Sequence, residues 1–307
     1  MGLETERSDL RAVAVREACV RVELCADDYG IAPGVGVAVR ELLGLRRLSA
    51  VSCMTVTRFW PDEARRLRDF TGQGDFGLHF TLTDLEPLGT LRAIAPSGRL
   101  PSLKRLMTAA YSGTIEVREV VDELHRQIDR FEAHMGAAPA YLDGHQHVHV
   151  LPGARDAVLA VFRDRLPSGT RIRYCTEPLE SLFRRGVAPL RGAFISLMSR
   201  HAARMWRTAG IPGNASFRGV RSFCEKTPYA ALFRRHLHDP VAGMLMMCHP
   251  GAANGPADRT DGIERQREAE YEFLRSPSFL QVLQSEGVRI ARPSGNRLGY
   301  STTTRLG

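Results

Sequence analysis

Residues 20–45, VRVELCADDYGIAPGVGVAVRELLGL, contain one complete strand–helix unit. The nearly continuous apolar run 20–26 predicts a buried strand, because hydrophobic side chains point to both of its faces. Residues 33–45 predict a helix with Pro33 in its first turn, where the missing N–H group costs nothing. Its apolar residues recur at helical spacing: Val35, Val39, Leu42 and Leu43.

The same alternation continues along the chain. Further strands are expected at 48–56, 76–82, 140–151, 170–175, 243–248 and 287–291. Helices are expected at 61–70, 103–111, 114–135, 154–162, 263–274 and over most of 177–211. Repeated strand–helix units favour a parallel α/β architecture. A single barrel-like domain of ~250 residues is a typical size, and an open doubly wound sheet is the main competitor.

The composition is typical of a protein with a real hydrophobic core: 43% of the 307 residues are hydrophobic and 25% are charged. The net charge of +8 is carried mostly by arginines, which are spread along the chain. Their densest groups lie in helix-like stretches beside Glu and Asp, so solvated helix faces are favoured over a nucleic-acid partner. The arginine-rich tract 179–220 has no assigned role.

Nothing in the sequence indicates a membrane segment or export. Residues 1–21 lack the long apolar core of a secretory signal, and no apolar run approaches the ~20 residues of a membrane helix. The six cysteines form no C-x-x-C pair, and buried free thiols are expected. We therefore expect a cytoplasmic protein without a membrane span, and a homodimer as the commonest oligomer.

Polar residues gather where the predicted strands end. They are Asp27, Asp28, His79, Asp143, His145, His147, His149 and His249. In parallel α/β proteins the active site lies at the carboxyl ends of the strands. This distribution therefore predicts an active site at that end of the sheet.

The adjacent carboxylates Asp27 and Asp28 repel each other and resist burial. They need a cation, a hydrogen-bond network or a pKa shift, although a turn with a capping Asp would also explain them. His79 lies between two apolar residues, and such a histidine is, by itself, more often a core residue than a metal ligand.

His145, His147 and His149 alternate along a predicted strand, so their side chains should point to one side. Imidazole is a common ligand of zinc and other transition metals. Not all three need to bind a metal, because the chain is expected to turn near Gly144 and one or two of them can orient the others. His249 ends a later strand before a rigid turn, which suits a proton donor or a simple turn.

Other common catalytic motifs are absent. The chain has no G-x-S-x-G elbow, no P-loop and no complete G-x-G-x-x-G after a strand. Three carboxylate or imidazole ligands with an open position are typical of a catalytic metal site rather than a closed structural one.

Four segments together resemble a known family. They are CADDYG at 25–30, GLHFTL at 77–82, DGHQHVH at 143–149 and HPG at 249–251. They are similar, in this order, to the signature segments of the YdjC-like carbohydrate deacetylases, over 21–291. That family includes chitooligosaccharide deacetylases and a branch associated with hopanoid biosynthesis.

The resemblance implies a distorted (β/α) TIM-like barrel over 20–293, with an N-terminal extension at 1–19 and a polar tail at 294–307. It also implies metal-dependent hydrolysis of the N-acetyl group of a sugar, either an N-acetylglucosamine-type oligosaccharide or a glycolipid, which releases acetate. One divalent ion is implied, with zinc or magnesium first and manganese, cobalt or nickel also compatible.

The resemblance assigns roles residue by residue. Asp28, His79 and His145 would bind the metal, Asp27 would be the general base and His249 the general acid. Candidates for supporting these ligands or contacting substrate are Asp143, His147 and His149.

Two other functions compete. A different single-metal amide or ester hydrolase on the same barrel would use the same residue types. A non-catalytic protein could bind a sugar or an anionic headgroup through the arginine-rich tract. The irregular stretch 83–113 is expected to be a long functional loop, and its closure over substrate is an open question.

Overall fold

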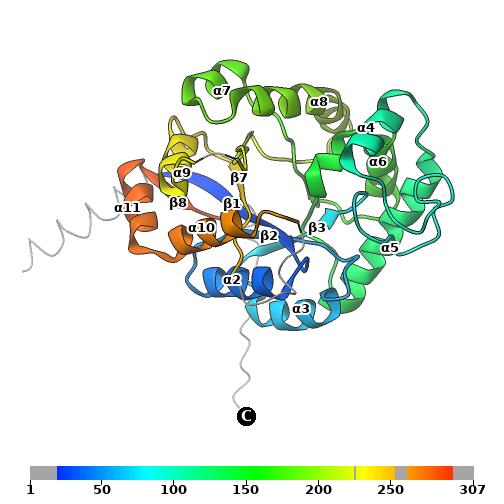
Figure 1. Ribbon diagram of the computed structural model, residues 1–307, viewed down its shortest axis with the longest axis horizontal. Coiled ribbons are helices and arrows are strands. Elements are labelled where there is room, and N and C mark those ends of the chain that lie inside the picture. Colours follow the sequence, from blue (N-terminus) through cyan, green and yellow to red (C-terminus); the bar gives the residue numbers. More distant parts are fainter. Residues whose placement is uncertain (1–18, 225, 253–260, 293–307) are drawn as a thin grey trace, which may run out of the picture.

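Parallel strands form the centre of the molecule and helices surround them (Figure 1). The computed structural model describes residues 19–224, 226–252 and 261–292. The strands are β1 Val20–Tyr29, β2 Ala50–Cys53, β3 Asp75–Phe80, β4 Tyr141–Gly144, β5 Arg171–Ile172, β6 Ser216–Arg218, β7 Met244–Cys248 and β8 Val288–Ile290. The helices are α2 Pro33–Gly44, α3 Trp60–Leu67, η1 Arg68–Phe70, α4 Leu103–Tyr111, α5 Val117–Met135, η2 His145–Val150, α6 Ala154–Asp164, α7 Leu179–Arg185, α8 Pro189–Thr208, α9 Tyr229–Leu237, α10 Glu264–Arg275 and α11 Pro277–Ser285.

All strand pairings are parallel, and the sheet order is β5-β4-β3-β2-β1-β7-β6, with β8 paired to β1. The two edges approach each other through the segments that flank β5 and β6. The Ile172 N–H donates to the Pro212 carbonyl at 2.8 Å, and the Phe217 N–H donates to the Thr176 carbonyl at 3.1 Å. The Asn214 side chain bonds both backbone groups of Tyr174 across this seam. The predicted distorted barrel is therefore confirmed, and the open doubly wound alternative is wrong.

Local sequence signals account for the best-predicted helices. Proline occupies the first turn of α2, whose buried face carries the apolar residues expected from their spacing. Helix α5 begins after Glu116, whose carboxylate accepts the Arg118 N–H, and it ends at Gly136 in the left-handed conformation. Helix α4 has the predicted bounds.

Some sequence predictions need correction. The strand predicted at 140–151 stops at Gly144, and η2 follows it. Strand β6 and helices α9 and α11 were not predicted. Asp27 and Asp28 lie inside β1, which is longer than the predicted strand.

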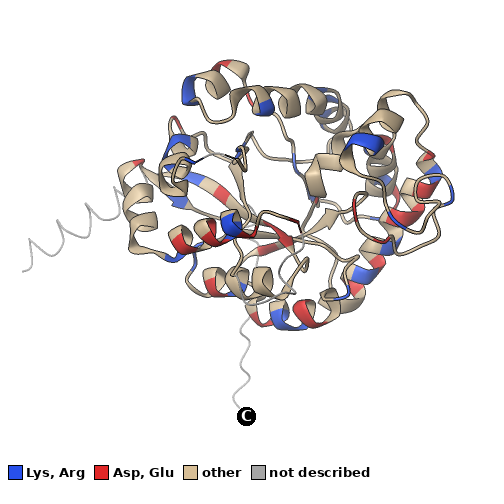
Figure 2. Cartoon of the chain, in the orientation of Figure 1, with Lys and Arg blue, Asp and Glu red and all other residues tan. Residues whose placement is uncertain are grey.

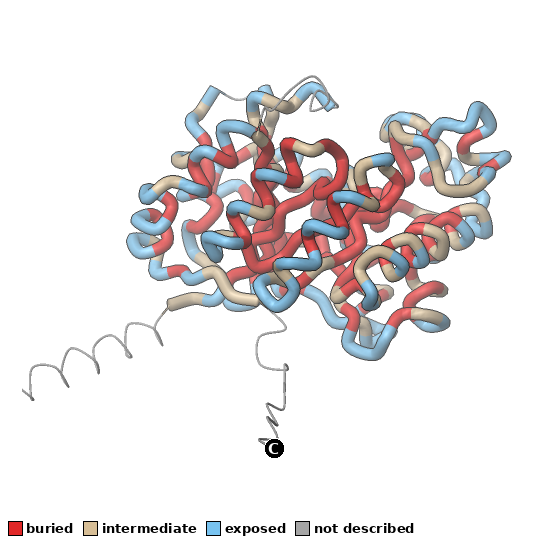
Figure 3. Tube along the Cα trace, turned by 90° about the horizontal axis from the view of Figure 1, so that it is seen from below, coloured by how far each residue is buried: buried red, intermediate tan, exposed pale blue. Residues whose placement is uncertain are grey.

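The interior of the barrel contains two layers of charged side chains. The N-terminal layer consists of Glu23, Asp75 and Arg171, and the C-terminal layer consists of Asp27, Asp143 and Arg173. Between them, the Tyr141 ring fills the space that a side chain at Gly77 would occupy, because a Cβ there would lie 2.4 Å from the ring. Figure 3 shows that the buried residues gather in the centre of the molecule. The apolar ones among them form one core cluster with members from both strands and helices.

No helix in the described part of the chain is long and apolar enough to cross a membrane. The predicted cytoplasmic location and homodimer stay predictions. The proposed extension 1–19, apart from Cys19, and the tail 294–307 lie outside the described residues.

Candidate functional site

A bulge at the end of β1 brings two neighbouring carboxylates to one cavity. The register between β1 and β2 shifts between Ala26 and Tyr29, and Asp28 has a left-handed φ of 65°. In a regular strand neighbouring side chains point to opposite faces, but a bulge redirects them. Asp27 and Asp28 therefore both line the same cavity, although both are almost fully buried.

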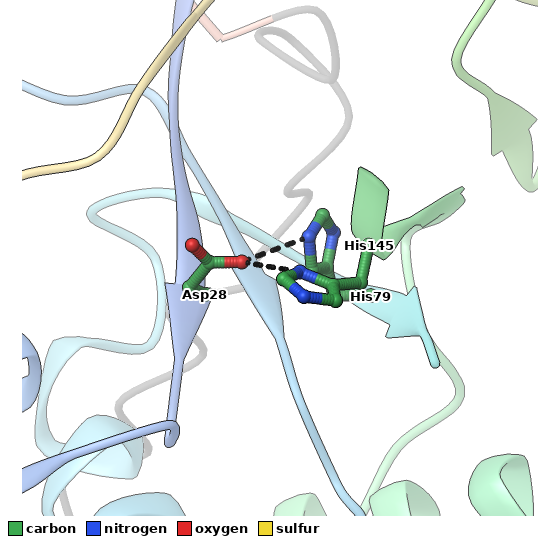
Figure 4. Close-up of side chains that lie close together, drawn as sticks. All are labelled: Asp28, His79 and His145. Carbon is green, nitrogen blue, oxygen red and sulfur yellow. Dashed lines mark hydrogen bonds and ion pairs between the residues drawn. The ribbon is translucent and has the colours of Figure 1, made fainter. Parts of the chain in front are cut away.

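Asp28, His79 and His145 form a three-residue cluster that can hold a metal ion. His79 lies in β3 and His145 directly follows β4, so three strand ends contribute one ligand each. One oxygen of Asp28, Oδ1, lies 3.2 Å from His79 Nε2 and 3.0 Å from His145 Nδ1. Figure 4 shows both rings turned toward this oxygen, and the ligand atoms of the group all lie within 4.8 Å of one another.

Asp143 orients the His79 ring through the ring nitrogen that faces away from Asp28. The Asp143 carboxylate lies 2.6 Å from His79 Nδ1, which leaves Nε2 to face Asp28 and the cavity. A carboxylate behind a histidine commonly fixes the ring of a metal ligand. Burial alone would lower the pKa of His79, but Asp143 and Asp28 outweigh it and raise that pKa to about 10. A metal ion that bound His79 would therefore displace a proton from it.

Arg173 holds Asp27 in a two-point ion pair. Its Nη1 and Nη2 donate to the two Asp27 oxygens at 2.7 and 2.6 Å. Nη2 also lies 2.5 Å from Asp143, so one buried guanidinium bridges the two carboxylates. Burial raises the pKa of Asp27, but the charge and hydrogen bonds of Arg173 outweigh burial and hold it below its usual range. Asp27 is therefore ionised at neutral pH and fixed in orientation.

Arg267 of α10 binds the second oxygen of Asp28. Its Nη2 lies 2.6 Å from Asp28 Oδ2, and it also pairs with Asp261. Burial raises the pKa of Asp28, yet Arg267 and His145 outweigh burial and hold this pKa well below its ordinary value. Asp28 thus presents one oxygen to the histidines and keeps its charge.

His147 and His149 do not belong to the three-residue cluster, although His147 lines the same cavity. The expectation that the alternating histidines share one side of a strand is wrong, because Gln146 and His147 adopt left-handed conformations within η2. His147 lies beside Cys175 and against the edge of Phe217. Burial and the Arg173 charge hold the pKa of His147 well below its usual value.

His149 supports the chain next to Arg173. Its Nε2 lies 3.1 Å from the Arg173 carbonyl oxygen, and its ring stacks on Trp206. Burial lowers the pKa of His149 to about 4, so the ring is neutral and can donate to that carbonyl. Gly144 permits this packing, since a Cβ there would lie 2.7 Å from the His149 ring.

His249 follows β7 and lines the cavity. Its backbone N–H donates to Glu270 at 2.5 Å, and the edge of its ring meets Phe223. The side chain is only partly buried, so the ring borders the space in which a ligand would lie.

The cavity has a volume of about 360 Å³. Its polar lining includes Asp27, Asp28, His79, His145, His147 and His249. Its walls come mainly from apolar side chains of α4, α8, β7 and the loops after β6 and β7. These apolar residues are Leu103, Met107, Phe194, Ile195, Met198, Val220, Phe223, Met247 and Ile263.

Sequence reasoning missed the two arginines of the site. Arg173 lies within a predicted strand, and Arg267 lies within a predicted helix, where both resemble ordinary surface residues. One signal was available for Arg173: it sits among apolar neighbours in RIRYC, and a buried cation requires a carboxylate partner. For Arg267 the sequence offers no comparable signal.

Comparisons with known proteins concern the chain as a whole. A model of the YdjC-like protein family matches residues 21–285. A human protein named carbohydrate deacetylase is 27% identical, over 88% of this chain and 89% of its own length. A chitooligosaccharide deacetylase from Enterobacter sp. (strain 638) is 31% identical, over 86% of this chain and 94% of its own.

The fold also recurs among solved structures. A crystal structure from Enterococcus faecalis V583, of a proposed cellobiose-phosphate cleavage protein, superposes with a TM-score of 0.67. It covers 89% of this chain and 97% of its own, at 17% sequence identity. This likeness concerns the fold alone.

Proposed function

Because the chain belongs to the YdjC-like protein family, we propose that it is a divalent-metal-dependent hydrolase that removes the acetyl group from an N-acetylated sugar. The observation that carries the proposal is the cluster of Asp28, His79 and His145, with ionised Asp27 beside it on the floor of one cavity. The names of the relatives support a carbohydrate substrate and the removal of an acetyl group.

The donor set fits a single divalent ion. Two imidazole nitrogens and one carboxylate oxygen suit zinc, manganese, cobalt or nickel better than magnesium, which prefers oxygen ligands. Bound there, such an ion supplies Lewis-acid polarisation of the acetyl carbonyl and acidification of water. We propose zinc first and keep magnesium within the test.

Asp27 is the proposed general base. It accepts the proton of the water that adds to the acetyl carbon. Arg173 donates to both carboxylate oxygens, and Cys25 Sγ also lies 3.6 Å from Oδ1, so Oδ2 is the oxygen that keeps a lone pair for the water. The low pKa of Asp27 keeps it ready to accept a proton at neutral pH and makes it a weak base.

His249 is the proposed general acid. The C–N bond breaks with its electron pair passing to nitrogen, and an amine needs a proton at this point to leave. The His249 ring borders the cavity from the end of β7, whereas the base comes from the end of β1. The two proton-transfer groups thus come from different strands around the site.

Acetate release tests the proposal. Metal-free protein is assayed on N-acetylglucosamine, its short oligomers and N-acetylglucosaminyl lipids, and again after addition of zinc, magnesium, manganese, cobalt or nickel singly. Release that requires an added metal supports the proposal and identifies both metal and substrate class. No release from folded, metal-loaded protein on any of these substrates would refute it.

A ligand variant is the matched control. We expect His145→Ala to lose metal and acetate release together, while His147→Ala, two residues along the same turn, keeps its metal. Full metal occupancy in His145→Ala would remove this residue from the proposed ligand set.

A further inference from the structure

Helix α8 exposes an apolar stripe on the face opposite the core. Its buried residues include Gly192, Ile195, Ser199, Ala202 and Trp206, which lie on one side of the helix. The other side carries Leu190, Phe194 and Leu197 at spacings of four and three residues, with exposed fractions of 77%, 50% and 51%. An exposed apolar stripe of this kind marks a contact surface.

The same stripe becomes cationic toward the end of α8. His201 and Arg204 continue it at helical spacing, and Arg200 and Arg207 flank it; all four are exposed. The whole helix Pro189–Thr208 contains no Asp or Glu, and its arginines stand without red neighbours within the helix in Figure 2. The surface therefore combines insertable apolar groups with uncompensated positive charge.

This surface joins the cavity at Phe194. The Phe194 side chain belongs to the exposed stripe and also lines the cavity. Met198, one turn further along α8, lines the cavity as well. Helix α4 forms another wall with Leu103 and Met107. Its exposed Lys104 and Arg105 add positive charge, and α4 also lacks acidic residues.

We propose that the outer face of α8 docks the protein on an anionic lipid surface, so that the cavity opens beside the bilayer. A helix with leucine and phenylalanine on one stripe and arginines along its length lies in the interfacial region of such membranes. Phe194 then connects the lipid surface to the site. An N-acetylated sugar carried by a lipid reaches Asp27 without leaving the membrane, a step that rests on the proposed function.

Charge favours lipid over a second copy of the chain. A two-fold contact pairs α8 with itself, so the arginines of one copy would face either the arginines or the leucines of the other. Because α8 carries no Asp or Glu, neither arrangement neutralises these charges, which disfavours the contact. Anionic headgroups neutralise the arginines instead.

Vesicle co-sedimentation tests the docking surface. The metal-loaded full chain is mixed with vesicles of phosphatidylglycerol or of phosphatidylcholine, at low and high salt. We expect binding to phosphatidylglycerol that weakens with salt and much weaker binding to phosphatidylcholine. Absence of binding to phosphatidylglycerol vesicles would overturn the proposal.

Surface variants locate the contact. Leu190→Glu/Leu197→Glu should lower the partition onto phosphatidylglycerol by about tenfold or more, because two inserted leucines become charged. Leu197→Glu alone has a matched control in Leu280→Glu on α11, since these leucines are 51% and 53% exposed. An equal loss in the Leu280→Glu protein would overturn the assignment to α8. Circular dichroism checks that each variant is folded.

Activity separates this proposal from the proposed function. The double variant should keep acetate release from soluble N-acetylglucosamine oligomers and lose it preferentially on N-acetylglucosaminyl lipid in phosphatidylglycerol vesicles. Vesicle binding without turnover on any substrate would refute the deacetylase alone. A parent dimer that the double variant dissociates in sedimentation equilibrium, without vesicle binding, would overturn docking in favour of an interface between copies.

Discussion

Arg171 and Arg173 point into the barrel two residues apart, and each lies between two carboxylates. Arg171 is 3.0 Å from Glu23 and 3.0 Å from Asp75. Arg173 is 2.6 Å from Asp27 and 2.5 Å from Asp143. The N-terminal and C-terminal layers of the barrel thus contain the same combination of charges.

The two layers differ in what lies next to them. The N-terminal layer packs against the Tyr141 ring, over which Arg171 lies at 5.3 Å. In the C-terminal layer Asp143 contacts His79, and Asp27 borders the cavity beside Asp28. The comparison separates a buried set of ion pairs that contacts no cavity from the same set placed beside the proposed metal ligands and an open cavity.

The largest expected difference between the layers concerns their carboxylates. Asp27→Asn should lower kcat by about 10²–10⁴-fold, the usual contribution of a general base, and leave metal binding intact. Asp75→Asn, the same chemical change in the N-terminal layer, should stay near parental activity. Acetate-release kinetics with metal analysis of the same samples measure both. Full turnover by metal-loaded Asp27→Asn would remove Asp27 as the base.

Substitution of Arg171 and of Arg173 should have similar effects on stability but different effects on activity. Arg171→Met and Arg173→Met should each lower the free energy of unfolding by about 3–5 kcal/mol, because each leaves buried carboxylates unpaired. Only Arg173→Met should also lower kcat/KM, by about 100-fold, since Asp27 loses its orientation. Urea unfolding and kinetics on the folded fraction test this pair. Equal activity losses would contradict the division into layers.

Removal of the Asp143 carboxylate, which contacts His79 Nδ1, should lower the affinity of the site for metal. Asp143→Asn should weaken metal affinity by about 10–100-fold, the usual effect of changing the partner of a ligating histidine. Ser52→Ala removes a hydrogen bond of 2.5 Å to the other Asp143 oxygen and should have the smaller effect. Competition with a chromophoric chelator measures both affinities. A larger loss in Ser52→Ala would contradict the proposed role of Asp143.

Metal affinity should rise with pH. Asp143 and Asp28 hold the pKa of His79 at about 10 in the metal-free site, so below that pH a bound ion must displace one proton. Affinity should therefore increase by up to about tenfold per pH unit between pH 6 and 9. Titration calorimetry in buffers of different ionisation enthalpy counts the released protons. A pH-independent affinity would show that His79 is neutral or not a ligand.

The sequence predicts those parts of the fold whose signals are local. Helix α2 has a proline start and regular apolar spacing, and β1 has a continuous apolar run. Helices α9 and α11 were missed, although Pro228 and Pro277 stand at their starts and could have indicated them. Strand β6 has only three residues, which is too short for a periodic pattern to be recognised.

The candidate site was partly predictable for a topological reason. Parallel strands bring their carboxyl ends together, so Asp28, His79 and His145 could be expected near one another, among the other polar residues at these ends. Their selection as metal ligands came from the family resemblance. The path of the chain after Gly144 could not be foreseen, because Gln146 and His147 adopt a conformation that such residues rarely take.

The ion pairs between residues far apart in the sequence could not be predicted from local sequence patterns. Arg173 lies 146 residues from Asp27, and Arg267 lies 239 residues from Asp28. Only the curvature of the whole sheet into a barrel brings each arginine to its aspartate, so no spacing in the sequence indicates these two ion pairs.

The most direct test of the account is acetate release titrated against bound metal. Metal-free protein receives the preferred ion in small increments, and the bound ion per chain and the rate are measured on the same sample. Single-metal hydrolysis predicts a rate of acetate release that rises in proportion to the bound metal and levels off at one ion per chain. Turnover without bound metal, or a rate that requires two ions per chain, would contradict it.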